Sequence, residues 1–118
     1  RDQPRSRGLG DVYKRQILSW DILRNHVSAF VSCPDWVSAK GMRMLGVPVK
    51  GDPTVISGES GAVGMGCLDA IMCDDTYKEL RQALELDRFS QVLLFSTEGN
   101  TDPMKFRKVL WDGEYPTV

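Results

Sequence analysis

The sequence contains few of the residues that most often build metal, redox or hydrolytic sites. It has one histidine, His26, and three cysteines, Cys33, Cys67 and Cys73, with no CxxC spacing. The histidine falls within a predicted helix and has no obvious acidic partner, which favours a surface residue over a general base or a hydrolase triad. An odd number of cysteines without metal-ligand spacing is typical of reduced thiols in a cytoplasmic protein.

Strong net charge and long apolar runs are also absent. The 118 residues carry a formal net charge of −1, and no run approaches the ~20 apolar residues that a membrane span requires. We therefore expect neither a nucleic acid nor a membrane as a partner. Gly61, Gly64 and Gly66 are not followed by a strand-linked acidic residue, so they do not complete a dinucleotide-binding fingerprint.

The first sixteen residues differ in character from the rest. Residues 6–16, SRGLGDVYKRQ, resemble a translated sequencing-library adaptor, whose end gatgtgtataagagacag encodes DVYKRQ in frame. A basic arm for nucleic acid or a targeting peptide is the alternative. We expect residues 1–16 to be adaptor-derived, not native and disordered. Without their five basic and two acidic residues, the remaining 102 residues, 17–118, carry a formal charge of about −4.

Apolar periodicity divides residues 17–118 into helices and two strands. It predicts helices over 19–30, 35–45, 61–73, 76–84 and 103–110, and buried strands over 54–57 and 91–95. Asp102 and Pro103 are the residues expected at the cap and first position of the last helix. The order ααβααβα indicates an α/β protein with part of a parallel sheet. Two strands cannot cover themselves, so we expect a C-terminal fragment of a longer chain.

The predicted helix over 61–73 is rich in small residues. Gly64, Gly66 and Ala70 lie along it, and an interior glycine costs roughly 1 kcal/mol relative to alanine. Close packing against a sheet, or the approach of a cofactor, is the expected reason for these residues.

Each predicted strand is followed by a polar turn. The two segments are VISGESGAVGMG (55–66) and VLLFSTEGNTDP (92–103), and each changes from apolar to small, hydroxylated and acidic residues where a helix would begin. Ligands bind at this edge of open α/β sheets. The sequence therefore predicts a binding site at these two turns.

As a pair, the turns resemble those of the diaminopropionate ammonia-lyase family, which are fold-type II pyridoxal-phosphate enzymes of the tryptophan synthase β-like superfamily. The first is similar to the family's SGESGA turn and the second to STEGDTDP, with Asn100 in place of Asp. The resemblance runs from residue 19 to the end of the chain, roughly the last quarter of the family's length. It implies a three-layer fold with a parallel sheet, pyridoxal phosphate as cofactor and a homodimeric parent enzyme. It also implies α,β-elimination of the amino acid 2,3-diaminopropionate to pyruvate and ammonia.

The resemblance implies cofactor-binding roles for Ser57, Gly58, Glu59, Ser96 and Thr97. Ser96 corresponds to the residue that faces the pyridine nitrogen; a hydroxyl can donate a hydrogen bond to a neutral pyridine but cannot hold it protonated. Glu59 would shape the cofactor and substrate pocket. From the residues alone, Ser96 is equally well a turn residue, and the helix dipole alone would favour Glu59.

No lysine in this chain corresponds to the Schiff-base position of the family. We therefore expect the catalytic residues to lie upstream and the piece alone to be inactive. Another fold-type II enzyme, similar to threonine or serine dehydratase or to tryptophan synthase β, is the nearest alternative, although Ser60 replaces the proline of the dehydratase turn. A non-catalytic small-molecule-binding module is the alternative from a different class.

Overall fold

The structure, a computed structural model, describes residues 19–118, which belong to two units. In the first unit, the described residues 19–31 contain a helix over 19–26. The prediction that this helix reaches residue 30 is therefore wrong. Asn25, His26 and Val27 all have lower helix propensity than leucine or alanine, which favours an end at this point. The prediction for residues 1–16 lies outside the described residues.

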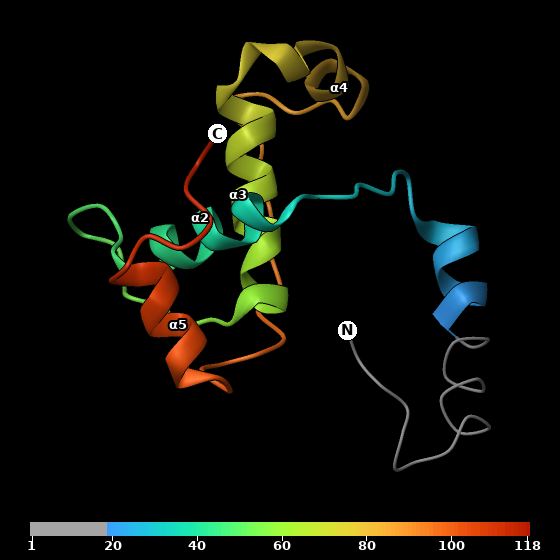
Figure 1. Cartoon of the computed structure of the whole chain (residues 1–118). Coiled ribbons are helices and arrows are strands. Elements are labelled where there is room, and N and C mark those ends of the chain that lie inside the picture. Colours follow the sequence, from blue (N-terminus) through green and yellow to red (C-terminus); the bar gives the residue numbers. More distant parts are fainter. Residues whose placement is uncertain (1–18) are drawn as a thin grey trace. The chain divides into compact units, whose positions relative to one another are not determined.

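The second unit, Ser32–Val118, contains the remaining helices (Figure 1). They are α2 (Asp35–Gly46), α3 (Glu59–Cys73), the 3₁₀ turn η1 (Asp75–Tyr77), α4 (Lys78–Ala83) and α5 (Pro103–Leu110). The Asp102 carboxylate accepts a hydrogen bond from the Lys105 amide at 3.2 Å, so the predicted cap of α5 is confirmed. The helix predicted over 76–84 is instead divided into η1 and α4. Its start lies earlier than predicted because the Asp74 side chain accepts a hydrogen bond from the Thr76 amide.

Two glycines bring the backbones of α2 and α3 into contact where the helices cross (Figure 1). A Cβ atom on Gly41 would overlap the carbonyl oxygen of Ala62, and one on Gly66 would overlap that of Val37. Close packing, one of the two expected reasons for small residues in this helix, is confirmed for Gly66. For Gly66 the neighbour is a helix, not the expected sheet.

The core of this unit lies between α2, α3 and α5. Its buried members are Ala39, Met42, Ala62 and Val109, and partly buried Leu45, Phe106, Leu110 and Tyr115 pack against them. The apolar positions of the helices predicted over 35–45 and 103–110 therefore converge on one small core.

Arg43 of α2 binds the segment of the chain that follows α5. Its guanidinium group donates hydrogen bonds to the backbone carbonyl groups of Val109, Glu114 and Tyr115. These carbonyls lie at and beyond the end of α5, where helix geometry leaves acceptors without partners. A charged donor on α2 therefore binds the Val109 carbonyl group near the end of α5 and holds the C-terminal segment.

The two segments predicted as strands are not strands in this structure, and no strand occurs anywhere in residues 19–118. A backbone hydrogen bond of 3.1 Å from the Gly58 amide to the Glu98 carbonyl joins the ends of these segments. A ladder needs a row of such bonds from neighbouring strands. The order ααβααβα is therefore not reproduced, and the parallel sheet stays a prediction.

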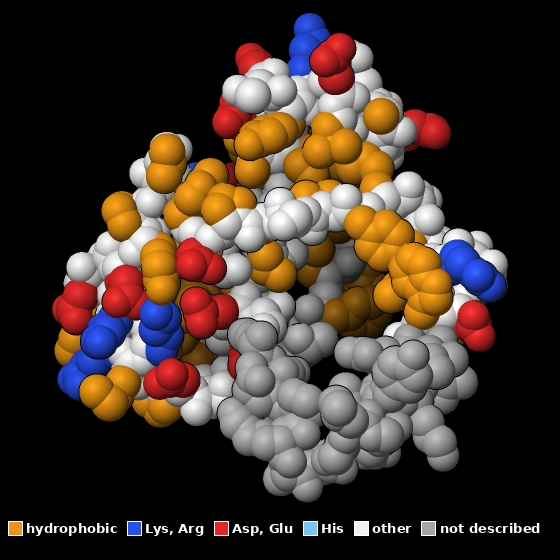
Figure 2. Space-filling view, turned by 45° about the vertical axis from the view of Figure 1, so that its right-hand side comes forward, with side chains coloured by type: hydrophobic (Ala, Val, Ile, Leu, Met, Phe, Trp, Pro, Cys, Tyr) orange, Lys and Arg blue, Asp and Glu red, His pale blue; other side chains and the backbone are white. Residues whose placement is uncertain are grey.

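The segment over 91–95 nevertheless has the surface of a strand that lacks its neighbours. Leu93 and Phe95 are 77% and 75% exposed, and Figure 2 shows hydrophobic side chains on the surface of the molecule. On its other side, Leu94 faces α3, where a Cβ on Gly64 would lie 3.3 Å from its side chain. Within residues 19–118, no helix has both the length and the apolar character needed to cross a membrane.

Candidate functional site

The two polar turns meet through a pair of serine hydroxyl groups. The Oγ atoms of Ser57 and Ser96 lie 2.8 Å apart, although 39 residues separate them in the chain. Ser57 is completely buried, whereas Ser96 is exposed. The pair therefore has one hydroxyl fixed in the interior and one that faces outward.

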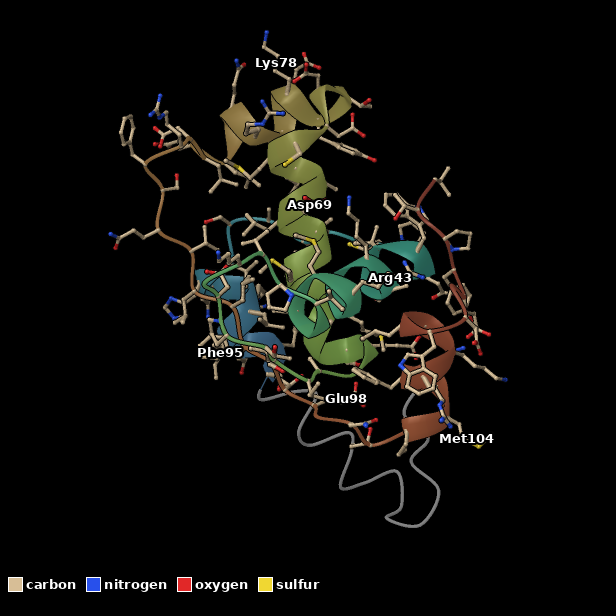
Figure 3. All side chains as sticks on the ribbon, turned by 90° about the vertical axis from the view of Figure 1, so that its left-hand side faces the viewer. Arg43, Asp69, Lys78, Phe95, Glu98 and Met104 are labelled. Atoms are coloured by element: carbon tan, nitrogen blue, oxygen red, sulfur yellow. The ribbon has the colours of Figure 1, made fainter. Side chains whose placement is uncertain are left out.

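Glu98 ties the same two turns together with both its backbone and its side chain. Its carbonyl oxygen accepts hydrogen bonds from the Gly58 amide at 3.1 Å and the Ser57 hydroxyl at 3.2 Å. Its carboxylate accepts from the Ser60 amide at 3.0 Å and the Thr101 hydroxyl at 3.2 Å. Figure 3 shows Glu98 beside the N-terminal end of α3. A carboxylate at this end also complements the helix dipole.

Sequence reasoning did not single out Glu98, although a signal was present. The N-cap residue of α3, Gly58, has no side chain with which to cap the first free amides. A helix start with glycine at the cap, paired with a second turn that carries a glutamate, favours a cap supplied from the second turn. Glu98 takes that role here.

The junction also requires glycine at position 61. A Cβ atom on Gly61 would overlap the Ser57 hydroxyl oxygen and lie 2.9 Å from the Glu98 carbonyl oxygen and 3.0 Å from the Ser96 hydroxyl oxygen. Any side chain there would push the two turns apart. The SGESG sequence is thus explained locally by the contact between the turns.

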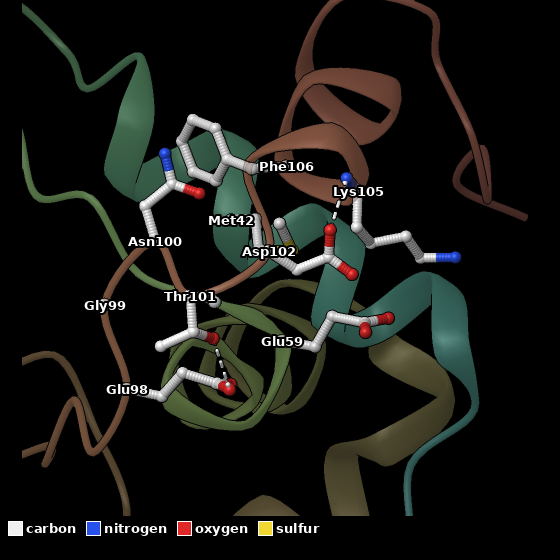
Figure 4. A pocket seen from close by; sticks show the side chains of 10 residues that line it. Met42, Glu59, Glu98, Gly99, Asn100, Thr101, Asp102, Lys105 and Phe106 are labelled. Carbon is white, nitrogen blue, oxygen red and sulfur yellow. Dashed lines mark hydrogen bonds between the residues drawn. The ribbon is translucent and has the colours of Figure 1, made fainter.

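A small pocket lies beside this junction (Figure 4). Its volume is about 40 Å³, and it is lined by Met42, Gly58, Glu59, Glu98, Gly99, Asn100, Thr101, Asp102, Lys105 and Phe106. Sites for small organic ligands usually measure about 300–1,000 Å³. The pocket is therefore too small to hold a cofactor by itself.

The structure groups the five predicted cofactor-binding residues only in part. Ser57 and Ser96 are in hydrogen-bond contact, and Gly58 adjoins them through its bond to the second turn. Glu59 is the first residue of α3 and lines the small pocket. Thr97 is exposed on the extended segment.

Two lysines of this unit form ion pairs with acidic partners. Lys40 forms an ion pair with Asp69 at 2.9 Å, and Lys105 forms one with Glu114 at 2.7 Å. The pKa of Lys105 is raised by its hydrogen bonds to Glu114 and to the Tyr115 hydroxyl. A lysine nucleophile must lose its proton, and the raised pKa of Lys105 opposes that loss. Nor do residues 19–118 contain three or more His, Cys, Asp or Glu residues grouped to hold a metal ion.

Comparison with known proteins finds close relatives of one kind. Diaminopropionate ammonia-lyase of Escherichia coli K12 is 48% identical over 98 residues, which cover 83% of this chain and 25% of the relative. The enzyme of Salmonella typhimurium LT2 is 45% identical over 98 residues, covering 82% and 24%. No protein-family model matches the chain.

The fold gives the same result. The crystal structure of the Escherichia coli enzyme in complex with D-serine matches with a TM-score of 0.80 and 46% identity, over 86% of this chain and 26% of that one. The complex with an aminoacrylate-PLP azomethine reaction intermediate also matches with a TM-score of 0.80 and 46% identity, over 86% and 27%.

These matches assign the fold to a class of enzyme and show which enzyme the chain is homologous to. The described fold is that of a segment of a fold-type II pyridoxal-phosphate enzyme. More particularly, the chain is a homologue of diaminopropionate ammonia-lyase and spans about a quarter of the length of the curated relatives it matches. The resemblance inferred from the two turns is confirmed.

Proposed function

We propose that this chain forms the pyridine-facing part of a pyridoxal-phosphate-dependent ammonia-lyase that converts 2,3-diaminopropionate to pyruvate and ammonia. The observation that carries the proposal is the contact between the two motifs, in which the buried Ser57 hydroxyl meets the exposed Ser96 hydroxyl at 2.8 Å. The similarity to diaminopropionate ammonia-lyases over most of the chain supports it.

The chemistry of the donor set fits a neutral pyridine ring. The groups around the Ser96 hydroxyl are a second hydroxyl and the Glu98 carbonyl oxygen. The Glu98 carboxylate is occupied by the Ser60 amide and the Thr101 hydroxyl. When bound, pyridoxal phosphate supplies the electron-withdrawing ring for elimination. Ser96 would donate a hydrogen bond to the ring nitrogen without protonating it, which would keep the ring a mild electron acceptor.

The other predicted residues take supporting places in this proposal. Gly58 is the N-cap residue of α3 and Glu59 is its first residue, and both would border the ring. Thr97 extends the second turn beside Ser96. Ser57 completes the set from the interior. The Schiff-base lysine and the proton-transfer groups belong to the part of the enzyme outside this chain.

The proposal extends to the whole enzyme that contains this segment. Its amino-acid substrate is supported by the Escherichia coli structures, which were determined with D-serine and with an aminoacrylate-PLP intermediate. A parallel sheet that covers the exposed segment 91–95, a homodimeric assembly and a cytoplasmic location are parts of the same proposal.

The proposal is tested first with residues 17–118 alone. We expect no amino acid to be turned over and no stoichiometric cofactor adduct on a lysine, because no lysine here holds the Schiff-base position. The measurement is incubation with pyridoxal phosphate, borohydride trapping, peptide mapping and a pyruvate assay with diaminopropionate. A single stoichiometric adduct on Lys40, Lys50 or another lysine of the fragment, with pyruvate formation, would overturn the assignment of the chemistry to upstream residues.

A further inference from the structure

Two hydroxyl groups and two carbonyl oxygen atoms meet at the junction of the turns. One of the carbonyl oxygens is that of Gly58, which lies 3.4 Å from the Ser57 hydroxyl oxygen. The Ser57 and Ser96 hydroxyl oxygens lie 2.8 Å apart, and the Glu98 carbonyl oxygen lies 3.2 Å from the first and 3.5 Å from the second. The carbonyl also accepts from the Gly58 amide. It therefore keeps one donor whichever way the two hydroxyl groups turn.

The distances define two arrangements of the two hydroxyl protons. With no acceptor in front of Ser96, the shorter contacts favour donation from Ser96 to Ser57 and from Ser57 to the Glu98 carbonyl. With an outside acceptor in front of Ser96, the order reverses, and Ser57 donates to Ser96 while Ser96 donates outward. A hydroxyl that accepts one hydrogen bond becomes a better donor of its own, because such chains polarise one another.

Ser57 is well placed to be the fixed member of this pair. It is completely buried, and the space beside its hydroxyl is so restricted that a Cβ on Gly61 would overlap it. Ser96, in contrast, is exposed on the extended segment. The buried hydroxyl therefore limits the positions that the exposed one can take.

We infer that Ser57 is a positioning residue that orients and polarises the Ser96 hydroxyl toward the pyridine nitrogen and does not itself contact the ring. The inference rests on the proposed function, which places Ser96 against the ring. In this inference the buried Ser57 of the SGESGA turn affects the cofactor only by orienting Ser96 of the second turn.

A double-mutant cycle in the full-length enzyme that carries this segment tests the inference. The variants are Ser57→Ala, Ser96→Ala and both together, with Ser60→Ala as a matched control because Ser60 is an exposed serine of the same turn. The readouts are the dissociation constant of pyridoxal phosphate, by equilibrium dialysis, and the ¹⁵N chemical shift of the ring nitrogen in labelled cofactor. Neither readout depends on turnover.

We expect Ser57→Ala to weaken cofactor binding about three- to tenfold, the range of one hydrogen bond, and to shift the ¹⁵N signal. In the Ser96→Ala background the same change should have no further effect on either readout. Ser60→Ala should match the wild type. Ser57→Cys, which keeps a side chain of similar shape but is a weak donor, should follow Ser57→Ala and serves if the alanine variant does not fold.

Two results would overturn the inference while leaving the proposed function intact. One is cofactor binding and a ¹⁵N signal in Ser57→Ala and Ser57→Cys that equal those of Ser60→Ala. The other is an equal loss from Ser57→Ala with and without Ser96, which indicates a purely structural role. If Ser96→Ala itself changes neither readout, Ser96 does not face the ring, and both the proposed function and this inference fail.

Discussion

The crossing of α2 with α3 and the extended segment 91–99 differ in how well the residues of this chain pack against them. At the crossing, Gly41 and Gly66 allow backbone contact, and Met42 is almost fully buried. Along the segment, Leu93 and Phe95 remain exposed, although they belong to an apolar run typical of a central strand. The crossing is a packed core, whereas the described residues leave these apolar side chains of the segment exposed.

The position of the candidate site follows from this contrast. The Ser57–Ser96 contact joins the packed α2–α3 region to the extended segment 91–99. Ser57, on the packed side, is buried, and Ser96, on the segment, is exposed. Binding and catalytic groups are commonly carried on loops that a rigid scaffold positions. Changes to the scaffold should therefore affect folding, and changes to the segment should affect the site.

The largest effect is expected from Gly66→Ala in the full-length enzyme. The new Cβ would overlap the Val37 carbonyl oxygen, and backbone on both sides cannot move aside cheaply, so we expect a loss of about 2–3 kcal/mol in the free energy of unfolding. Urea unfolding measures it. Gly99→Ala is the control on the segment, where a Cβ meets nothing within 4 Å, and should change stability by less than about 0.5 kcal/mol. Equal losses would contradict the contrast between the two regions.

A smaller loss is expected from Arg43→Met. The change removes the charged hydrogen bonds to the carbonyl groups of Val109, Glu114 and Tyr115. A single hydrogen bond to a charged group contributes about 1.5–3 kcal/mol. Because water can satisfy carbonyl groups at a helix end, we expect a net loss of about 2 kcal/mol in the free energy of unfolding and faster amide exchange in α5. Hydrogen exchange with mass spectrometry locates the change. In the control Arg107→Met, which removes only a contact with the exposed Trp111 ring, exchange should stay near the wild-type rate. Unchanged exchange in Arg43→Met would show that the C-terminal segment is held by other contacts.

Glu98→Ala should have a moderate and local effect at the junction. It leaves the Ser60 amide at the start of α3 without its acceptor, and the loss of a helix cap costs about 1 kcal/mol. Exchange of the first amides of α3 should accelerate, while exchange at the α2–α3 crossing should not. Thr101→Val, which removes only the hydroxyl partner of the same carboxylate, should leave the α3 amides protected. Protection that survives Glu98→Ala would exclude the proposed capping role.

The smallest expected effect concerns thiol reactivity in the isolated second unit, residues 32–118. Burial, together with the neighbouring Cys33 thiol, raises the pKa of Cys67 from 9.0 to about 11. The thiolate is the reactive form, so labelling of Cys67 by iodoacetamide should be slow at pH 8–9 and rise about tenfold per pH unit until about pH 11. The exposed Cys73 should be labelled first. Mass spectrometry gives both rates, and a Cys67 rate equal to that in urea would show that the thiol is not shielded.

The sequence predicted the packed region of α2, α3 and α5 better than the extended segments expected to be strands. The periodic apolar positions of α2 and α5, and the Asp102 cap, are local signals, and the structure reproduces them. The crossing at Gly66 could not be assigned to a helix partner, because a small residue indicates close approach but not what approaches. The strands were predicted from apolar runs alone, and a strand requires neighbours that the described chain does not contain.

The residues of the candidate site were also predicted only in part. Motif resemblance identified Ser57 and Ser96, but no pattern in the sequence indicates that two serines 39 residues apart share a hydrogen bond. Glu98 was missed because its role depends on the missing side chain of Gly58 in the other turn. Such partnerships are tertiary, so they appear only when the two turns are brought together.

The most direct test of the account compares Ser96→Asp with Ser96→Ala in the full-length enzyme. A carboxylate would hold the ring nitrogen protonated, so Ser96→Asp should change the absorbance spectrum of the bound cofactor and slow the elimination. Ser96→Ala should mainly weaken cofactor binding, by about three- to tenfold for one hydrogen bond, and keep measurable turnover with excess pyridoxal phosphate. If both variants keep the wild-type spectrum, cofactor affinity and rate, Ser96 does not face the pyridine nitrogen, and the central claim is contradicted.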